Sequence, residues 1–124
     1  MKDPTSPVCR TISTLLARIG DKWTVLVVQT LADGPKRFNQ LRREIPSVSQ
    51  RMLTLTLRNL ERDGLVNRTV TPSIPPRVDY ELTTLGHSLQ KPICGLANWA
   101  LDNVEAIHGA QARFDAAHDA AEAA

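Results

Sequence analysis

Apolar side chains at helical spacing predict two helices in the first third of the chain. Over residues 9–19 they recur at i, i+3, i+4 and i+7, the pattern of an amphipathic helix, and Gly20 ends this segment. The residues of the stripe are Ile12, Leu15, Leu16 and Ile19. A second amphipathic helix is expected over about residues 22–32, with Asp21 as its N-cap and the Asp-Gly-Pro sequence at 33–35 as its stop.

The next two predicted helices differ in length and are joined by a turn that contains Pro46. Residues 38–45 predict a short helix, and residues 50–63 predict a longer one that Ser49 caps and Gly64 ends. The apolar inner face of the longer helix consists of Leu53, Leu57 and Leu60, with Met52 alongside. Its polar outer face consists of Gln50, Arg51, Thr54 and Arg58. This pair predicts a helix-turn-helix, in which the second helix enters the major groove of DNA.

A change to β-branched residues predicts a hairpin after the second helix of this pair. Residues 65–71 and 78–82 alternate in part and predict two strands, and the adjacent Pro75 and Pro76 at the tip cannot pair in a ladder. The order of short helix, turn, long helix and hairpin predicts a winged helix-turn-helix. The expected fold class is therefore α+β, mainly α with a small β-hairpin wing.

A last, long helix is predicted from Thr83 or Thr84 to Gly109. Pro92 lies inside it and should kink it at a cost of about 3 kcal/mol, because proline lacks the N–H that the helix needs there. Beyond the kink lie more apolar side chains than so small a domain can cover, which predicts a homodimer through this helix. The residues of the helix assigned to this interface are Ile93, Leu96, Trp99, Ala100, Val104 and Ile107. The alternative is a C-terminal helix folded back on its own domain.

The length of 124 residues allows one domain. We expect a flexible N-terminus over residues 1–8, the domain with its dimerisation helices over 9–109, and an alanine-rich tail of high helix propensity over 110–124. The longest apolar run, residues 25–28, is far shorter than the about 20 residues that cross a bilayer, so no membrane association is expected. Two cysteines and the absence of an apolar leader predict the reducing cytosol.

The net charge of +2 conceals an uneven distribution. Residues 36–77 hold nine Lys and Arg against three acidic residues, a net of +6, whereas residues 78–124 have a net charge of −5. The basic segment coincides with the helix-turn-helix and the hairpin, which favours a polyanionic partner, double-stranded DNA, over a merely solvated charged surface. The candidate contacts to base edges are Ser47, Ser49, Gln50, Arg51 and Thr54. The other candidate DNA contacts, mainly to phosphates, are Lys36, Arg37, Asn39, Arg42, Arg43, Arg58, Arg68 and Arg77.

Several longer segments are similar to those of one known family. They are GDKW (20–23), DGPKRFNQL (33–41), IPSVSQRML (45–53), LRNLERDGLV (57–66) and PPRVDYELT (75–83). In sequence and order they resemble the hallmark segments of HxlR-type transcriptional regulators. The resemblance implies a homodimeric, MarR-like winged-helix DNA-binding protein from a bacterium or archaeon. In this family the N- and C-terminal helices build the dimer interface, which adds Ile12 and Leu16 of the first helix to the expected interface residues. It also implies recognition-helix contacts at Ser49, Gln50, Arg51 and Thr54, and a wing contact at Arg77.

The sequence departs from this family pattern in the recognition helix. Many members have a basic residue at the position of Thr56 and a polar one at the position of Leu55. Two explanations remain open at this point. A phosphate contact is missing here, or Leu55 packs against a protein partner or a thymine methyl group.

Cys9 is the candidate sensor residue. It precedes or begins the first helix beside Arg10, and both a helix N-terminus and a cation stabilise a thiolate. Some HxlR-type regulators have an N-terminal cysteine that senses oxidants or electrophiles, and Cys9 matches that position. Two hypotheses follow: Cys9 is a redox or electrophile switch, with an intersubunit disulfide as one form, or it is a structural cysteine. Cys94 is expected to be a small hydrophobic residue of the core.

An enzyme is not expected. The three histidines, His87, His108 and His118, share no ligand or triad spacing with the cysteines, so we assign no catalytic residue, metal site or cofactor. The expected function is sequence-specific DNA binding by a homodimer on a palindromic operator. The alternative is a winged helix used only for protein–protein contacts. A small-molecule or oxidant inducer is left open, as are the operator and the direction of regulation.

Overall fold

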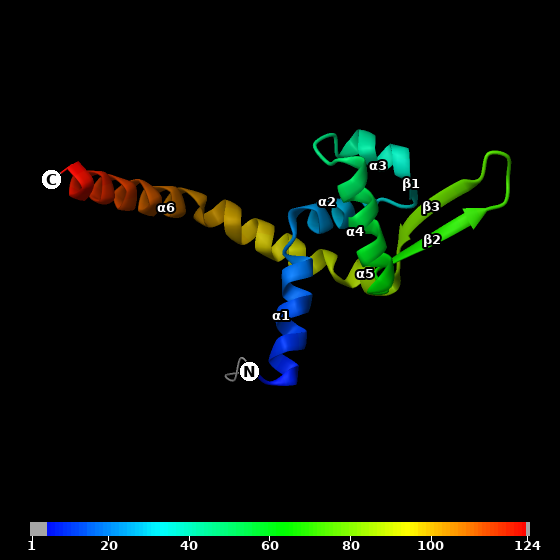
Figure 1. Cartoon of the computed structure of the whole chain (residues 1–124), viewed down its shortest axis with the longest axis horizontal. Helices are drawn as coiled ribbons and strands as arrows, with labels where there is room; N and C mark the ends of the chain where they lie inside the picture. The colour runs from blue at the N-terminus through cyan, green and yellow to red at the C-terminus, as the bar shows by residue number, and fades with distance from the viewer. Residues whose placement is uncertain (1–4, 124) are drawn as a thin grey trace. The chain divides into compact units, whose positions relative to one another are not determined.

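The computed structural model of the chain describes residues 5–123. It divides into two compact units, the first ending at Gln90 and the second beginning at Lys91. The first unit contains the helix-turn-helix and the sheet, and the second is the greater part of one long helix (Figure 1). Four residues of the predicted flexible N-terminus, 1–4, lie outside the described residues.

Two helices begin the first unit, as the apolar spacing predicts. Helix α1 spans Pro7–Ile19 and helix α2 spans Lys22–Leu31. Helix α1 begins two residues before the predicted start, because the Ser6 side chain accepts a hydrogen bond from the Cys9 N–H at 3.1 Å and caps it. Asp21 caps α2 as predicted, and its carboxylate accepts hydrogen bonds from two N–H groups in the first turn.

The helix-turn-helix consists of α3, Phe38–Glu44, and α4, Gln50–Arg62. The Ser49 hydroxyl accepts a hydrogen bond from the Met52 N–H at 3.0 Å, which fixes where α4 begins. Gly64, with a φ of +76°, follows the C-cap residue and ends the helix, since its left-handed conformation costs a glycine little. The leucines of the predicted inner face of α4 are buried: Leu53, Leu57 and Leu60.

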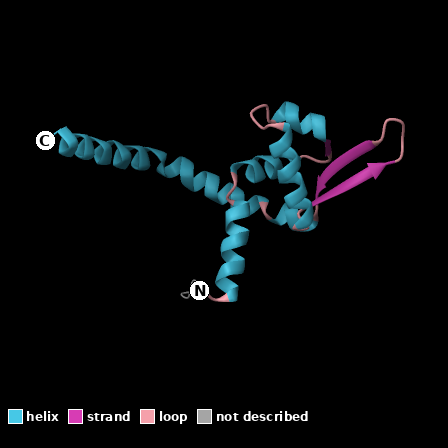
Figure 2. Ribbon diagram, viewed as in Figure 1, coloured by secondary structure: helices cyan, strands magenta, loops and turns pink. Residues whose placement is uncertain are grey.

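A three-stranded antiparallel sheet completes the first unit, in the order β1-β3-β2. The strands are β1 (Lys36–Arg37), β2 (Val66–Thr71) and β3 (Arg77–Leu82). The first strand was not predicted, because two residues are too short for any alternation to be visible. Val66 and Leu82 are buried at the base of the hairpin, and the other residues of β2 are exposed. The hairpin therefore projects from the core as a wing, which Figure 2 shows in magenta.

The prediction of one long helix kinked at Pro92 is wrong. The chain forms a short helix α5, Thr84–Ser88, and a separate helix α6, Gln90–Ala123, with Leu89 between them. Pro92 is therefore in the first turn of α6, where an N–H has no partner inside the helix and its loss costs nothing. The packing of α5 requires a glycine, because a Cβ at Gly86 would overlap the carbonyl oxygen of Leu65.

The second unit is helical throughout its described residues, including the alanine-rich segment up to Ala123. Phe114 stacks on the His118 ring with 3.9 Å between the ring centroids. Several large apolar side chains of this unit are exposed, namely Leu96, Trp99, Leu101, Val104, Ile107 and Phe114. Ile93 differs from them, since it is already buried in the single chain and does not belong to the exposed set. Among residues 5–123, no helix has the length and apolar content that crossing a membrane requires.

Candidate nucleic-acid interface

The outward side of α4 is the centre of the candidate interface. Arg51, Thr54, Leu55 and Arg58 stand at i, i+3, i+4 and i+7, so their side chains share one helix face. All four are exposed, while the leucines on the opposite side of α4 are buried in the core. With Gln50 they line a shallow concavity of about 570 Å³. The buried leucine stripe therefore fixes which face of α4 is presented outward.

Hydrogen bonds inside α4 limit what its first two turns offer to a ligand. The Thr54 hydroxyl donates to the Gln50 carbonyl at 2.8 Å, which leaves its oxygen lone pairs and its methyl group exposed. Within residues 5–123 the side chains of Gln50 and Arg51 form no hydrogen bond or ion pair. Gln50 and Arg51 are therefore the groups in the first two turns of α4 whose donors are available to a base edge.

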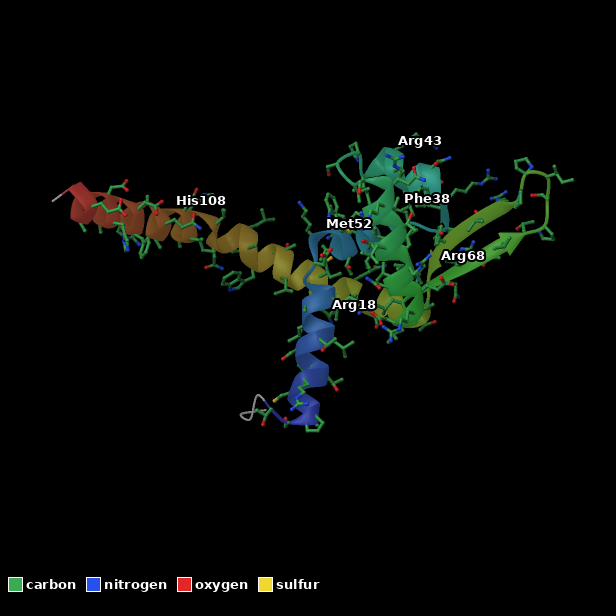
Figure 3. All side chains as sticks on the ribbon, in the orientation of Figure 1. Arg18, Phe38, Arg43, Met52, Arg68 and His108 are labelled. Carbon is green, nitrogen blue, oxygen red and sulfur yellow. The ribbon has the colours of Figure 1, made fainter. Side chains whose placement is uncertain are left out.

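A second concavity, of about 390 Å³, lies between α3 and the hairpin. Arginines from three elements line it: Arg37 of β1, Arg43 of α3 and Arg77 of β3 (Figure 3 labels Arg43). Arg77 is held by Asp79, with 3.0 Å between its Nε and the carboxylate. The other residues that line this second concavity are Phe38, Asn39, Gln40, Pro76 and Val78. Three guanidinium groups in one concavity are chemically suited to bind an anion such as a phosphate.

A third concavity, of about 320 Å³, lies between α4 and the hairpin. Arg58 of α4 and Arg68 of β2 line it, together with Thr54, Glu61 and Tyr80. Arg68 and Tyr80 are directly opposite in the β2–β3 ladder, so they project from the same face of the hairpin (Figure 3 labels Arg68). Sequence reasoning missed Tyr80, because its position opposite Arg68 depends on the hairpin register, which the pattern of each strand does not determine.

Not every predicted DNA contact belongs to these concavities. The Lys36 ammonium is ion-paired with Glu44 at 2.7 Å and its side chain is only 10% exposed, so Lys36 is not available on the surface. Arg42, Ser47 and Ser49 are exposed, but none of them lines any of these three concavities. The remaining predicted contacts do line one: Arg37, Asn39, Arg43, Gln50, Arg51, Thr54, Arg58, Arg68 and Arg77.

The two positions of α4 that depart from the family pattern differ in environment. Thr56 is buried, at 5% exposure, so its side chain lies inside the unit, where no phosphate reaches it. Leu55 lies on the outward face and is 49% exposed. Of these two residues, only Leu55 is therefore accessible to a ligand.

The cysteines lie in unexpected environments. Cys9 is the third residue of α1 and is buried, at 8% exposure, although a reagent needs access to a thiol. Cys94 is exposed, so the expectation that it belongs to the core is wrong. In this part of α6 the preceding residue, Ile93, is buried. Successive residues of a helix differ in direction by about 100°, so Cys94 projects from a different side of α6 than Ile93 does. In the described part of the chain, no three His, Cys, Asp or Glu side chains gather as a metal site would require.

A helix-turn-helix with a projecting hairpin and an arginine-rich outer surface defines a winged helix-turn-helix transcriptional regulator. The family model described as "HxlR-like helix-turn-helix" matches residues 18–108. The chain belongs to this family.

Individual relatives agree with the family match. The chain is 42% identical over 106 residues to the uncharacterized HTH-type transcriptional regulator YdeP of Bacillus subtilis, covering 81% of this chain and 83% of YdeP. It is 37% identical over 93 residues to the HTH-type transcriptional regulator YodB of B. subtilis, covering 75% of this chain and 83% of YodB. These relatives are transcriptional regulators and not enzymes.

Solved structures of the family share this fold. The reduced form of the redox regulator HypR superposes with a TM-score of 0.72 at 40% identity, over 80% of this chain and 98% of HypR. The reduced form of YodB from B. subtilis superposes with a TM-score of 0.67 at 35% identity, over 77% of this chain and 91% of YodB. The prediction of a MarR-like winged helix-turn-helix is therefore confirmed.

Proposed function

We propose that this protein binds double-stranded DNA sequence-specifically, as a homodimer on a palindromic operator. The observation that supports this most directly is the outward face of α4, where Arg51 and Arg58 flank a concavity above the buried leucines. An α-helix with side chains, about 10–12 Å across, fits the major groove of B-DNA, about 12 Å wide. Gln50 and Arg51 in its first turn are the residues proposed to contact base edges.

The distribution of free guanidinium groups supports phosphate contacts around that helix. In the helix-turn-helix and the wing, the arginine side chains that form no hydrogen bond or ion pair with any residue between 5 and 123 are Arg37, Arg42, Arg43, Arg51, Arg58, Arg62 and Arg68. A polyanion would supply the missing partners, and the concavities beside α3 and the hairpin would each receive a backbone phosphate.

Exposed apolar side chains on two helices support the homodimer. In the first unit α1 exposes Leu16 at 61%, and in the second unit α6 exposes Trp99 at 59% and Leu96 at 67%. Apolar surface of this extent on a monomer is typical of an interface. Two copies related by a two-fold axis would place their α4 helices one helical turn of DNA apart, about 34 Å, which requires a palindrome. DNA as the target implies a cytoplasmic location in a prokaryotic cell.

Selection of bound duplexes from a random pool by the wild-type protein tests this function. We expect enrichment of one palindrome whose half-sites lie about 10 base pairs apart. A protein–protein interaction module would enrich no sequence, and its weak retention of DNA would not depend on sequence. Enrichment of a single half-site would support DNA binding but contradict the homodimer.

A redox response through Cys9 is the second candidate function. HypR is described as a redox regulator with reduced and oxidized structures, and YodB has a diamide-treated structure. By analogy, oxidation of Cys9 would change the affinity for the operator. The position of Cys9 in the first turn of α1 supports a link to that helix.

A further inference from the structure

Leu55 is an exposed apolar side chain among the polar and charged side chains on the outward face of α4. The other leucines of this helix, Leu53, Leu57 and Leu60, are at most 2% exposed, whereas Leu55 is 49% exposed. Exposing a leucine forfeits the free energy that its burial would contribute. No other residue that lines the concavity over α4 has an apolar side chain. Leu55 therefore forfeits about half of the burial that the other leucines of α4 contribute to the fold.

The position of Leu55 is central on that face. Arg51 precedes it by four residues and Arg58 follows it by three, so the two arginines flank it above and below on the helix surface. Thr54 is next to it and is exposed, and its hydroxyl donates a hydrogen bond to the Gln50 carbonyl. A small apolar spot thus lies between two guanidinium groups, where α4 would contact the floor of a groove.

The charge around this spot decides between a protein and DNA as its occupant. The concavity is lined by two guanidinium groups and by no carboxylate. Two cations without an acidic partner suit a polyanion, and the major groove of DNA is bordered by phosphates and contains apolar methyl groups. The side chains around Leu55 are therefore complementary to DNA.

Only one chemical group in the major groove suits a leucine. The edges of guanine, adenine and cytosine present donors and acceptors there, and thymine adds a methyl group at C5. 5-Methylcytosine presents the same methyl group in modified DNA. We propose that Leu55 is a specificity-determining residue that packs on the C5-methyl group of a pyrimidine in each half-site. This inference rests on the proposed function, because it requires α4 in the major groove.

Replacement of thymine by deoxyuridine removes this methyl group and leaves the base pair intact. Each thymine of the selected operator is replaced in turn, and the affinity is measured by fluorescence anisotropy for the wild type and for Leu55→Ala. At one thymine in each half-site we expect the wild type to lose about three- to tenfold in affinity, and Leu55→Ala to lose nothing further. Leu85→Ala, which truncates a similarly exposed leucine of α5, is the matched control and should keep the wild-type response.

A second comparison separates the two sources of the methyl group. At the same position, cytosine and 5-methylcytosine are compared in otherwise identical duplexes. If the methyl group is the feature recognised, 5-methylcytosine binds tighter than cytosine for the wild type but not for Leu55→Ala. A loss on deoxyuridine replacement combined with tighter binding of thymine than of 5-methylcytosine identifies thymine as the preferred base.

Three outcomes would overturn the inference. If the wild type binds the operator and no deoxyuridine replacement weakens it, Leu55 does not contact a methyl group. If the deoxyuridine penalty persists in Leu55→Ala, another residue makes the contact. If the wild type binds no duplex in preference to another, the proposed function fails and the inference fails with it. Circular dichroism of both variants confirms that they are folded.

Discussion

Arg18 in the last turn of α1 is ion-paired with Asp63, the C-cap residue of α4. The Arg18 Nη1 lies 3.0 Å from Oδ1 and 2.9 Å from Oδ2 of the carboxylate. The two side chains are 24% and 22% exposed, so solvent screens the pair only in part. This ion pair joins a helix proposed for the dimer interface to the end of the helix proposed for the major groove.

Arg18→Ala should lower the free energy of unfolding by about 1 kcal/mol, because it leaves a partly buried carboxylate without its partner. Thermal unfolding followed by circular dichroism measures the change. Arg10→Ala is the control, since Arg10 lies on the same helix and is exposed. Equal melting temperatures for the two variants would show that the pair contributes nothing to stability.

Arg51→Ala should relax the sequence preference at one base pair of each half-site, because a bidentate arginine contributes about 1–3 kcal/mol of discrimination. Repeating the duplex selection with this variant gives the preference position by position. Arg62→Ala removes an exposed arginine from the last turn of the same helix and should leave the preference unchanged. A uniform loss of affinity in Arg51→Ala would assign Arg51 to a phosphate.

Arg68→Ala should weaken binding to all sequences alike, because a phosphate carries no sequence information. It should also reduce the slope of log K against log salt by about one for each phosphate that is no longer neutralised. Tyr80→Phe, which removes only the hydroxyl at the same concavity, should weaken binding without changing that slope. Anisotropy titrations at several salt concentrations provide both quantities. Arg113→Ala on the acidic C-terminal segment is the control, and a slope change there as large as in Arg68→Ala would contradict the assignment.

Trp99→Ala should raise the dissociation constant of the homodimer at least about tenfold, since exposed tryptophans at interfaces are frequent hot spots. Sedimentation velocity over a range of concentrations measures it. Asn98→Ala changes the neighbouring exposed residue of α6 and should leave the dimer intact. A wild-type chain that sediments as a monomer at all concentrations would refute the homodimer itself.

Cys9→Ser should abolish any loss of operator binding caused by peroxide or quinone, if Cys9 is the sensor. Cys94→Ser is the matched control, because Cys94 is the exposed cysteine and is accessible to the same reagents. Operator binding is measured before and after treatment, and again after reduction. A response that survives in Cys9→Ser and disappears in Cys94→Ser would transfer the sensor role to α6.

Local rules were sufficient to predict where α2 and α4 begin. Ser49 and Asp21 cap the helices that they were predicted to cap, since an N-cap depends only on the neighbouring backbone. The inner face of α4 follows from the spacing of its leucines. Local rules were insufficient after Thr83. The apolar spacing correctly predicted helical structure there, but the helix is interrupted at Leu89 and not at Pro92. A proline is tolerated in the first turn of a helix. Whether Pro92 lies in a first turn depends on where the helix begins.

The sequence by itself determined the fold class, the basic segment and the outward face of α4, because each depends on residue type and on short, regular spacing. The tertiary structure alone decided which charged and polar side chains are available to a ligand. In the folded chain Lys36 is ion-paired with Glu44, and Thr56 is buried. Tyr80 lies beside the arginines of the third concavity. These results depend on which residues, distant in sequence, come to lie within a few ångströms, and periodicity along one helix or strand contains no information about that.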